Sequence, residues 1–270
     1  RQRQMCIRDS VSPFVLRRVK EDVVADLPEK IEDTVVAQLT GEQRKLYLAN
    51  QDRIAQQVQH REASEFKKDK LKVLAELTKL RQICCDPRLH YEDYKAGSAK
   101  LDTCMELVHG ALDGGHRILL FSQFTGMLDI IGKRLAKEDI AFLKLTGASS
   151  KESRAKMVAQ FQAGEVPVFL ISLKAGGVGL NLTAADVVIH YDPWWNVAAQ
   201  DQATDRAHRI GQQHTVTVYK LIAKDTIEER IMRMQESKRD LVNSVLGGDG
   251  ISSALFTRED VLALLGGDGR

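Results

Sequence analysis

From residue 98 onward, short uninterrupted apolar runs alternate with segments whose apolar residues recur every three or four positions. The runs indicate strands buried on both faces, and the periodic segments indicate amphipathic helices. This alternation predicts an open parallel α/β sheet, with right-handed crossovers placing helices on both faces. Strands are expected at 117–122, 141–145, 168–173, 187–191 and 216–222. Helices are expected at 127–137, 150–162, 197–208 and 226–245, after an earlier helix that Ser98 caps and Gly114-Gly115 ends.

The residues before this alternation form a different kind of segment. A strand is expected near 34–39, followed by two helices. The second helix has one apolar face, and Asp86-Pro87 ends it. That face consists of Val73, Leu77, Leu80 and Cys84.

These patterns of apolar and polar residues divide the chain into four expected units. Residues 1–10, RQRQMCIRDS, show no periodicity and are expected to be a tail or a scar. Residues 11–97 are expected to form a connector, and residues 98–246 the α/β domain. Residues 247–270, with two Gly-Gly-Asp-Gly pieces around a short apolar helix, are expected to be a loosely attached extension.

Composition narrows the class of protein. Lys and Arg number 39 against 37 Asp and Glu, a formal charge of +2, so any nucleic-acid surface must be a local patch. No stretch approaches the ~20 apolar residues of a membrane helix, and no signal-like segment opens the chain. We therefore expect a cytoplasmic protein without a membrane partner. The four cysteines contain no C-x-x-C pair, which predicts buried thiols and neither a zinc site nor disulfides. They are Cys6, Cys84, Cys85 and Cys104.

Ligands of open α/β sheets bind at the carboxyl ends of the strands, so a site is expected in the loops there. Four loops have distinctive chemistry, although each singly is also compatible with an ordinary turn or helix cap. Hydroxyl and amide groups occupy the first, and the second lies at a helix start, where free backbone N–H groups bind anions. Glycines in the third allow close approach of backbone to phosphate. The loops span 122–125, 146–149, 174–179 and 202–212.

The fourth loop carries two arginines. Arg206 and Arg209 are three residues apart, so on a helix end they would share one face. Guanidinium forks bind phosphate in a bidentate manner and can neutralise charge on a transferring phosphoryl group. The structural alternative is that Arg206 pairs with Asp201, Asp205 or the helix dipole. His208 is expected to pack or hydrogen-bond and not to act as a base.

Four runs follow one another at characteristic spacings: ILLFSQF, LTGASSKESRAKMVAQF, ISLKAGGVGLNLTAADVVIHYDPWWN and QATDRAHRIGQ. In this order they resemble the C-terminal motor lobe of SWI/SNF-type ATPases of helicase superfamily two. The S-L-K-A-G-G run looks like the bacterial branch more than the eukaryotic remodellers. The resemblance covers about residues 98–240, and the segments PFVLRRVKEDVVADLP and LRQICCDP resemble those that lead into that lobe from the first.

This resemblance implies roles for particular residues. Arg206 and Arg209 would be arginine fingers, and the nucleotide would lie near Gly177, Gly179, Asn181 and Gln202. DNA would contact Ser122, Gln123, Thr146, Gly147, Lys174, Ala175, Trp195 and Asn196. Val197 replaces the proline that usually follows the Trp-Asn pair, which affects the expected shape of that loop. Lys174, Thr146, Gln123 and Trp195 are expected to share one DNA-facing surface, distinct from the face that presents the two arginines to ATP.

Two parts of such a motor have no counterpart in this sequence. A phosphate-cradling G-x-x-x-x-G-K-[ST] loop and a D-E-x-H Mg²⁺ site are expected in the first lobe. The segment most similar to the phosphate-cradling loop, 126–134, is one residue too long and ends in Arg. It belongs to an expected helix whose apolar residues are part of the core. No metal ligand is therefore expected in this chain, and Mg²⁺ would be held by the first RecA-like lobe of the same full-length protein.

The resulting hypothesis is a RecA-like lobe that supplies arginine fingers and half of the DNA track to an ATP-driven translocase on double-stranded DNA. Such a fragment would be half of an ATP hydrolase, inactive alone, and nucleoid-associated in a bacterium. One rival is a dinucleotide-binding α/β enzyme domain using Gly177-Val178-Gly179, although its fingerprint requires glycine where Leu182 stands. The other rival is a scaffold that binds DNA without a motor.

Overall fold

The computed structural model describes residues 27–60, 63–173, 175, 179–194, 196–244 and 257–266. Within these residues the chain forms a six-stranded sheet in the order β1-β6-β5-β2-β4-β3, and every neighbouring pair is parallel. The predicted parallel α/β class is confirmed. The strands are β1 Lys30–Ala37, β2 Ile118–Ser122, β3 Phe142–Leu145, β4 Val168–Ser172, β5 Val187–His190 and β6 Val216–Ala223.

One strand comes from the segment expected to be a connector. β1 pairs with β6 in parallel over its whole length, from Lys30 opposite Val216 to Ala37 opposite Ala223. It begins four residues before the expected strand and is an outermost strand of the sheet. Residues upstream of the α/β alternation therefore complete the sheet.

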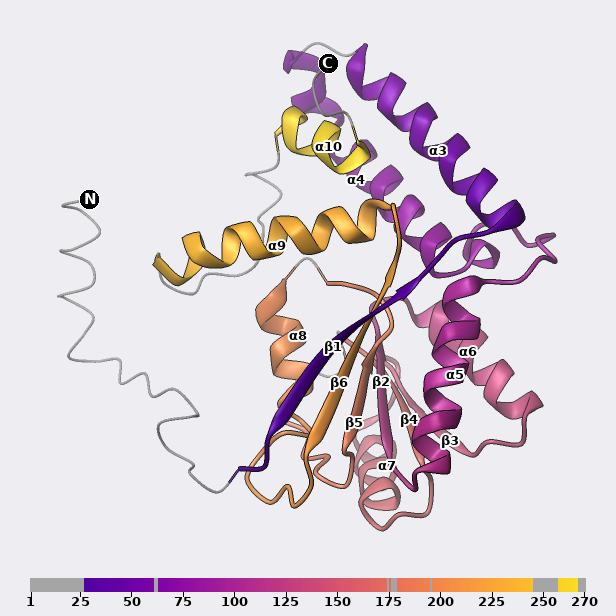
Figure 1. Ribbon diagram of the computed structural model, residues 1–270, viewed down its shortest axis with the longest axis vertical. Coiled ribbons are helices and arrows are strands. Elements are labelled where there is room, and N and C mark those ends of the chain that lie inside the picture. The colour runs from indigo at the N-terminus through magenta and orange to yellow at the C-terminus, as the bar shows by residue number, and fades with distance from the viewer. Residues whose placement is uncertain are drawn as a thin grey trace.

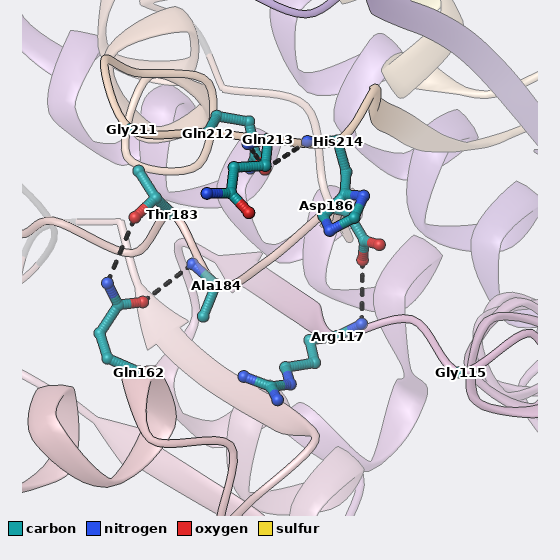
Figure 2. Close-up of a pocket in the computed structure, with 10 residues that line it drawn as sticks. All are labelled: Gly115, Arg117, Gln162, Thr183, Ala184, Asp186, Gly211, Gln212, Gln213 and His214. Atoms are coloured by element: carbon teal, nitrogen blue, oxygen red, sulfur yellow. Dashed lines mark hydrogen bonds between the residues drawn. The ribbon is translucent and has the colours of Figure 1, made fainter.

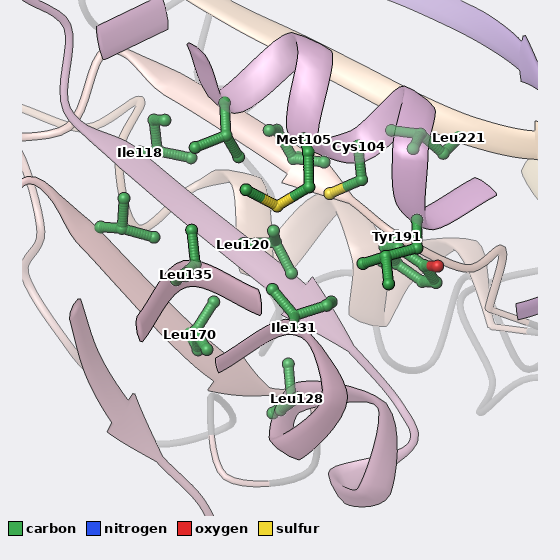
Figure 3. Packing of buried hydrophobic residues seen from close by; sticks show 14 of the residues in the cluster. Cys104, Met105, Ile118, Leu120, Leu128, Ile131, Leu135, Leu170, Tyr191 and Leu221 are labelled. Carbon is green, nitrogen blue, oxygen red and sulfur yellow. The ribbon is translucent and has the colours of Figure 1, made fainter. Parts of the chain in front are cut away.

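Helices cover both faces of the sheet (Figure 1). α5 and α6 pack on one face, where β2 contributes Ile118 and Leu120 (Figure 3). α7 and α8 cover the other face through Phe161 and Ala203. The helices are α3 Gly41–Gln59, α4 Ala63–Cys85, α5 Ala99–Asp113, α6 Thr125–Lys137, α7 Lys151–Gln162, α8 Val197–Thr204, α9 Ile227–Ser244 and α10 Arg258–Leu265.

A second core forms among helices near the carboxyl ends of the strands (Figure 1). α3, α4, α9 and α10 meet there, and the predicted apolar face of α4 is buried in this cluster. α10 was expected to be loosely attached, and this expectation is wrong for the helix. Its Leu264 and Leu265 are buried, and their carbonyl groups accept hydrogen bonds from Arg230 (2.9 Å) and Gln51 (2.6 Å). A helix that buries leucines against α3 and α9 is held by the hydrophobic effect.

The cysteines follow the sequence expectation where the structure describes them. Cys84, Cys85 and Cys104 are free and buried, and burial raises the pKa of the Cys104 thiol to about 12. Cys6 lies outside the described residues. None of the helices in the described part of the chain is long and apolar enough to span a bilayer.

Candidate functional site

Polar loops follow the carboxyl ends of β2, β3, β4 and β5. We call this end of the sheet its carboxyl edge, and the end at which the strands begin its amino edge. Because these parallel strands are neighbours, the predicted DNA-binding residues that the structure describes lie along the carboxyl edge. They are Ser122, Gln123, Thr146, Gly147, Ala175 and Asn196. Lys174 and Trp195 belong to the same loops but lie outside the described residues.

The loop after β2 is held from within. Ser122 is fully buried; its hydroxyl donates to the Asp192 carboxylate and accepts from the backbone N–H of Phe124 at 3.1 Å. The Gln123 N–H also points to Asp192, at 3.3 Å from both carboxylate oxygens. The Ser122 side chain therefore fixes the loop and does not face solvent, unlike a residue that contacts DNA.

The other loops at this edge also use polar groups internally. The Thr146 hydroxyl accepts from the Ala148 N–H at 3.4 Å, while Gly147 is exposed with open space around it. Ala175 is buried, and its carbonyl accepts from Arg154 of α7 at 3.2 Å. The Asn196 side chain caps α8 by accepting from the Ala199 N–H at 3.2 Å.

The arginine segment lies at the opposite, amino edge of the sheet. α8 follows β5 and leads back across the sheet, so its end lies near the residues that precede β1 and β6. His208 Nε2 is 2.8 Å from the Pro28 carbonyl oxygen, just upstream of β1. The fourth loop therefore does not lie at the carboxyl ends as expected, because α8 intervenes between β5 and the arginines.

α8 also ends earlier than predicted. It stops at Thr204, whose hydroxyl is 2.8 Å from Nε2 of the buried His190, and turns follow to residue 211. The two arginines consequently do not share a helical face. Arg206 is 7% exposed, whereas Arg209 and Ile210 are exposed.

Hydrogen bonds fix the shape of these turns. The Arg206 carbonyl accepts from the Leu182 N–H at 3.0 Å. The segment that connects β4 to β5 therefore lies beside residues 205–211, here called the arginine turn. Gln212 is buried and donates to the Ala185 and Ala207 carbonyls at 2.7 and 3.1 Å. Gly211 has a φ of +101°, which glycine adopts without strain.

The electrostatics of the two arginines differ. Arg206 Nε is enclosed and has no hydrogen-bond acceptor among the described residues. Burial, followed by the charge of Arg209, lowers the pKa of Arg206 from its ordinary value. A guanidinium with an enclosed, unsatisfied N–H fits an anionic oxygen.

The predicted nucleotide-binding residues are only partly described. Gln202 is exposed on α8, the same helix that ends before Arg206. Asn181 is exposed and directly precedes Leu182, which binds the arginine turn. Gly179 is exposed with a φ of +35°, and Gly177 lies outside the described residues. Residues 179–186 contain no helix, in contrast to the helix that opens after a dinucleotide-binding glycine loop.

A pocket of about 350 Å³ adjoins the arginine turn (Figure 2). Gln162 forms part of its wall by donating to Thr183 at 3.3 Å and accepting from the Ala184 N–H at 2.9 Å. Arg117 and Asp186 form another part through a 2.9 Å backbone-to-carboxylate bond. The sequence interpretation assigned no role to these residues.

Sequence reasoning missed a buried polar network around α4. Arg81 donates to Gln123 Oε1 at 3.1 Å and to the Pro193 carbonyl, and its side chain is 2% exposed. Arg81 lies four residues after Leu77, on the predicted apolar stripe of this helix. A charged residue within such a stripe is the signal that could have identified it.

A buried ion pair joins α5 to α9. Lys100 donates to Glu228, and both side chains are 0% exposed. Although burial acts in the opposite direction, the charge of Glu228 raises the pKa of Lys100. Glu228 also accepts from the Ala223 N–H at 2.9 Å, which ties the pair to the end of β6.

The fold matches that of known domain families. Residues 99–211 match the family described as the helicase conserved C-terminal domain, and residues 2–89 match the SNF2-related domain. The chain belongs to the SNF2-related ATPases and corresponds to the C-terminal lobe of their core. The dinucleotide-binding alternative is not favoured.

Similar proteins agree with this family. A protein named an uncharacterized ATP-dependent helicase from Mycoplasma pneumoniae is 40% identical over 255 residues, covering 94% of this chain and 24% of that protein. The putative ATP-dependent helicase/translocase YwqA of Bacillus subtilis is 39% identical, covering 94% and 28%. The chain therefore spans about a quarter of the length of these curated relatives.

Solved structures match the same region. The C-terminal domain of the Sulfolobus solfataricus SWI2/SNF2 ATPase is similar with a TM-score of 0.71 and 32% identity, covering 87% of this chain and 98% of that one. The core of that ATPase in complex with double-stranded DNA gives a TM-score of 0.73 and 34% identity, covering 96% and 55%.

Proposed function

We propose that this chain is the second motor lobe of an ATP-dependent translocase on double-stranded DNA. The observation that carries the proposal is the enclosed Arg206 guanidinium beside the exposed Arg209, at the sheet edge opposite the polar loops. In this proposal, the amino edge meets nucleotide phosphate and the carboxyl edge meets DNA. The first motor lobe belongs to the same full-length protein and closes over the nucleotide.

The two arginines would act on ATP in different ways. Arg206 is fixed by the turn that Leu182 and Gln212 hold, so its guanidinium supplies a prepositioned charge. Arg209 is exposed and supplies a charge that can reach across to a nucleotide on the first lobe. When ATP is bound, water attacks its γ-phosphate. Permanent positive charges stabilise the charge that develops there.

In this proposal the first lobe is the partner of the arginine turn, in which Arg209 and Ile210 are both exposed. Within the described residues, no group of three His, Cys, Asp or Glu side chains could hold a metal ion. Mg²⁺ in phosphoryl-transfer sites is held by one or two carboxylates together with the substrate phosphates, and we assign those carboxylates to the first lobe.

DNA contact is proposed for the carboxyl edge. The SWI2/SNF2 core of Sulfolobus solfataricus was solved with double-stranded DNA, and this supports the same class of ligand here. Gln123, Thr146 and the exposed Gly147 are the described groups that could meet phosphate oxygens, with Lys174 and Trp195 proposed from the sequence. Such backbone contacts give little sequence preference.

The test is ATP hydrolysis by the full-length protein with and without duplex DNA. We expect duplex DNA to stimulate phosphate release, and NAD to show no binding in a parallel titration. DNA binding without ATP hydrolysis would favour the scaffold alternative, whereas hydrolysis that does not respond to DNA would contradict the proposed coupling to DNA.

The 270-residue chain alone should bind ATP no tighter than about millimolar, because a half site meets the triphosphate's charge only partly. It should fold cooperatively yet release no phosphate above background, even with saturating duplex DNA. Steady hydrolysis by this chain, lost in Arg209→Ala so that contamination is excluded, would contradict the division of parts between two lobes.

A further inference from the structure

We propose that Arg81 is a positioning residue that sets the loops after β2 and β5 in the geometry for binding DNA. The inference rests on the proposed function for its DNA consequence, while its structural part can be tested without DNA. Arg81 lies on α4, outside every segment to which the sequence analysis assigned a ligand.

The contacts of Arg81 bridge two loops. Nη1 donates to Gln123 Oε1 at 3.1 Å in the loop after β2, and Nη2 donates to the Pro193 carbonyl in the loop after β5. Nη2 is also 3.9 Å from Asp192 Oδ2. Because β2 and β5 are neighbours in the sheet, one guanidinium fixes the spacing between their two loops.

The chemistry of this network requires arginine. Asp192 is fully buried, and it accepts the Ser122 hydroxyl and the Gln123 N–H. A buried carboxylate needs a nearby positive charge. The planar guanidinium provides this charge and at the same time donates hydrogen bonds to two other acceptors. The guanidinium also lies over the Phe124 ring, with Cζ 5.7 Å from the ring centroid.

Arg81 also fixes the orientation of the Gln123 amide. A guanidinium only donates, so the amide oxygen must face it and the NH₂ group must point away. Gln123 Nε2 is enclosed, and no described residue accepts a hydrogen bond from it. A phosphate oxygen that entered this loop would supply the acceptor.

The chain contains its own reporter of this arrangement. Its two tryptophans, Trp194 and Trp195, directly follow the Pro193 carbonyl that Arg81 binds. The Trp194 carbonyl accepts from Gln235 of α9, and its N–H lies 3.4 Å from Gln200 Oε1. Tryptophan emission from the chain therefore reports on the loop after β5 alone.

The first experiment measures tryptophan emission and acrylamide quenching of the 270-residue chain without DNA. Arg81→Met should shift the emission and increase quenching, because the Pro193 carbonyl beside the tryptophans loses its hydrogen-bond donor on α4. Arg81→Lys keeps the charge but not the fork and should give an intermediate change; it serves alone if Arg81→Met does not fold. Val73→Ala, a core truncation at the other end of the described apolar face of α4, is the control for lost stability and should leave both signals unchanged.

The second experiment measures duplex-DNA affinity of the full-length protein. Arg81→Met and Gln123→Ala should each weaken binding by about tenfold, the loss expected for a charge-assisted hydrogen bond. If Arg81 acts through Gln123, the double variant should lose little more than either single variant. Gln123→Glu keeps the acceptor for Arg81 but removes the amide donor, and it should weaken binding as much as Gln123→Ala.

Unchanged tryptophan signals in Arg81→Met, or equal changes in Val73→Ala, would overturn the positioning role. Additive losses of DNA affinity would overturn its action through Gln123. If the tryptophan signals change as expected but wild-type protein does not bind duplex DNA, the proposed function fails while the structural role of Arg81 stands.

Discussion

The two edges of the sheet use most of their polar side chains in opposite ways, and Gln123, whose Nε2 lacks a described acceptor, is an exception at the carboxyl edge. At the carboxyl edge, polar side chains form hydrogen bonds within the protein through their oxygen atoms, as Ser122, Thr146 and Asn196 do. At the amino edge, the Arg206 Nε is enclosed without an acceptor in the described structure, and Arg209 is exposed. Residue type alone would assign ligands to both edges. Unsatisfied hydrogen-bonding groups are the better indicator of a site, because the fold gains nothing from leaving them unpaired.

The largest effect is expected at the amino edge. Arg209→Ala, in a protein containing both lobes, should abolish most DNA-stimulated ATP hydrolysis, with a loss of about 10³ to 10⁵ in rate. DNA affinity and the melting temperature should change little, because the side chain is exposed. Phosphate release with saturating duplex DNA measures the effect.

Arg233→Ala removes an exposed arginine on α9 and is the matched control. Arg206→Ala should lose hydrolysis similarly, with more damage to stability because this side chain is buried. A rate loss below about tenfold for Arg209→Ala would contradict its assignment as an arginine finger.

The buried pair Lys100–Glu228 is satisfied within the fold, so a substitution there should reduce stability, in contrast to the loss of ATP hydrolysis expected for Arg209→Ala. Lys100→Met leaves the Glu228 carboxylate buried and unpaired, so the free energy of unfolding should fall by about 3–5 kcal/mol. Urea unfolding measures this loss. The double variant with Glu228→Gln should recover part of it, and a single-variant loss below about 1 kcal/mol would mean that the pair is not isolated from water.

Asn196 separates a helix cap from a DNA ligand. Asn196→Ala should lower the free energy of unfolding by about 1 kcal/mol, because α8 loses its N-cap acceptor. Asn196→Ser keeps an acceptor and should retain most of that stability in the same melt. If Asn196→Ser matches wild type in stability yet binds DNA as weakly as Asn196→Ala, the amide contacts DNA in addition to capping the helix.

The smallest effect concerns Lys174. Lys174→Ala should weaken DNA binding about equally for unrelated duplex sequences and reduce the salt slope of binding by roughly one charge. Fluorescence anisotropy over a range of salt concentrations measures both quantities. A loss that depends strongly on the DNA sequence would show that Lys174 reads bases instead of phosphate.

Local patterns predicted most of the elements because each apolar run or periodic face is specified by neighbouring residues. β4, for example, begins at Val168 as expected, and α5 is capped by Ser98 and ends before Gly114. Boundaries failed where a distant contact decided them. α8 ends at Thr204 within a region where His190 and Leu182 bind its last residues and the following turn, and these partners are invisible to a local pattern.

The sequence by itself determined the parallel α/β class, the family and the residue types available for phosphate contact, because periodicity and motif order are properties of the chain alone. Only the tertiary structure decided which polar groups are already satisfied. It buried Ser122 against Asp192, brought Arg81 of α4 to the loops after β2 and β5, and placed the arginine turn at the edge opposite those loops. The physical reason is that hydrogen-bond satisfaction and burial depend on partners far apart in sequence, which folding alone brings together.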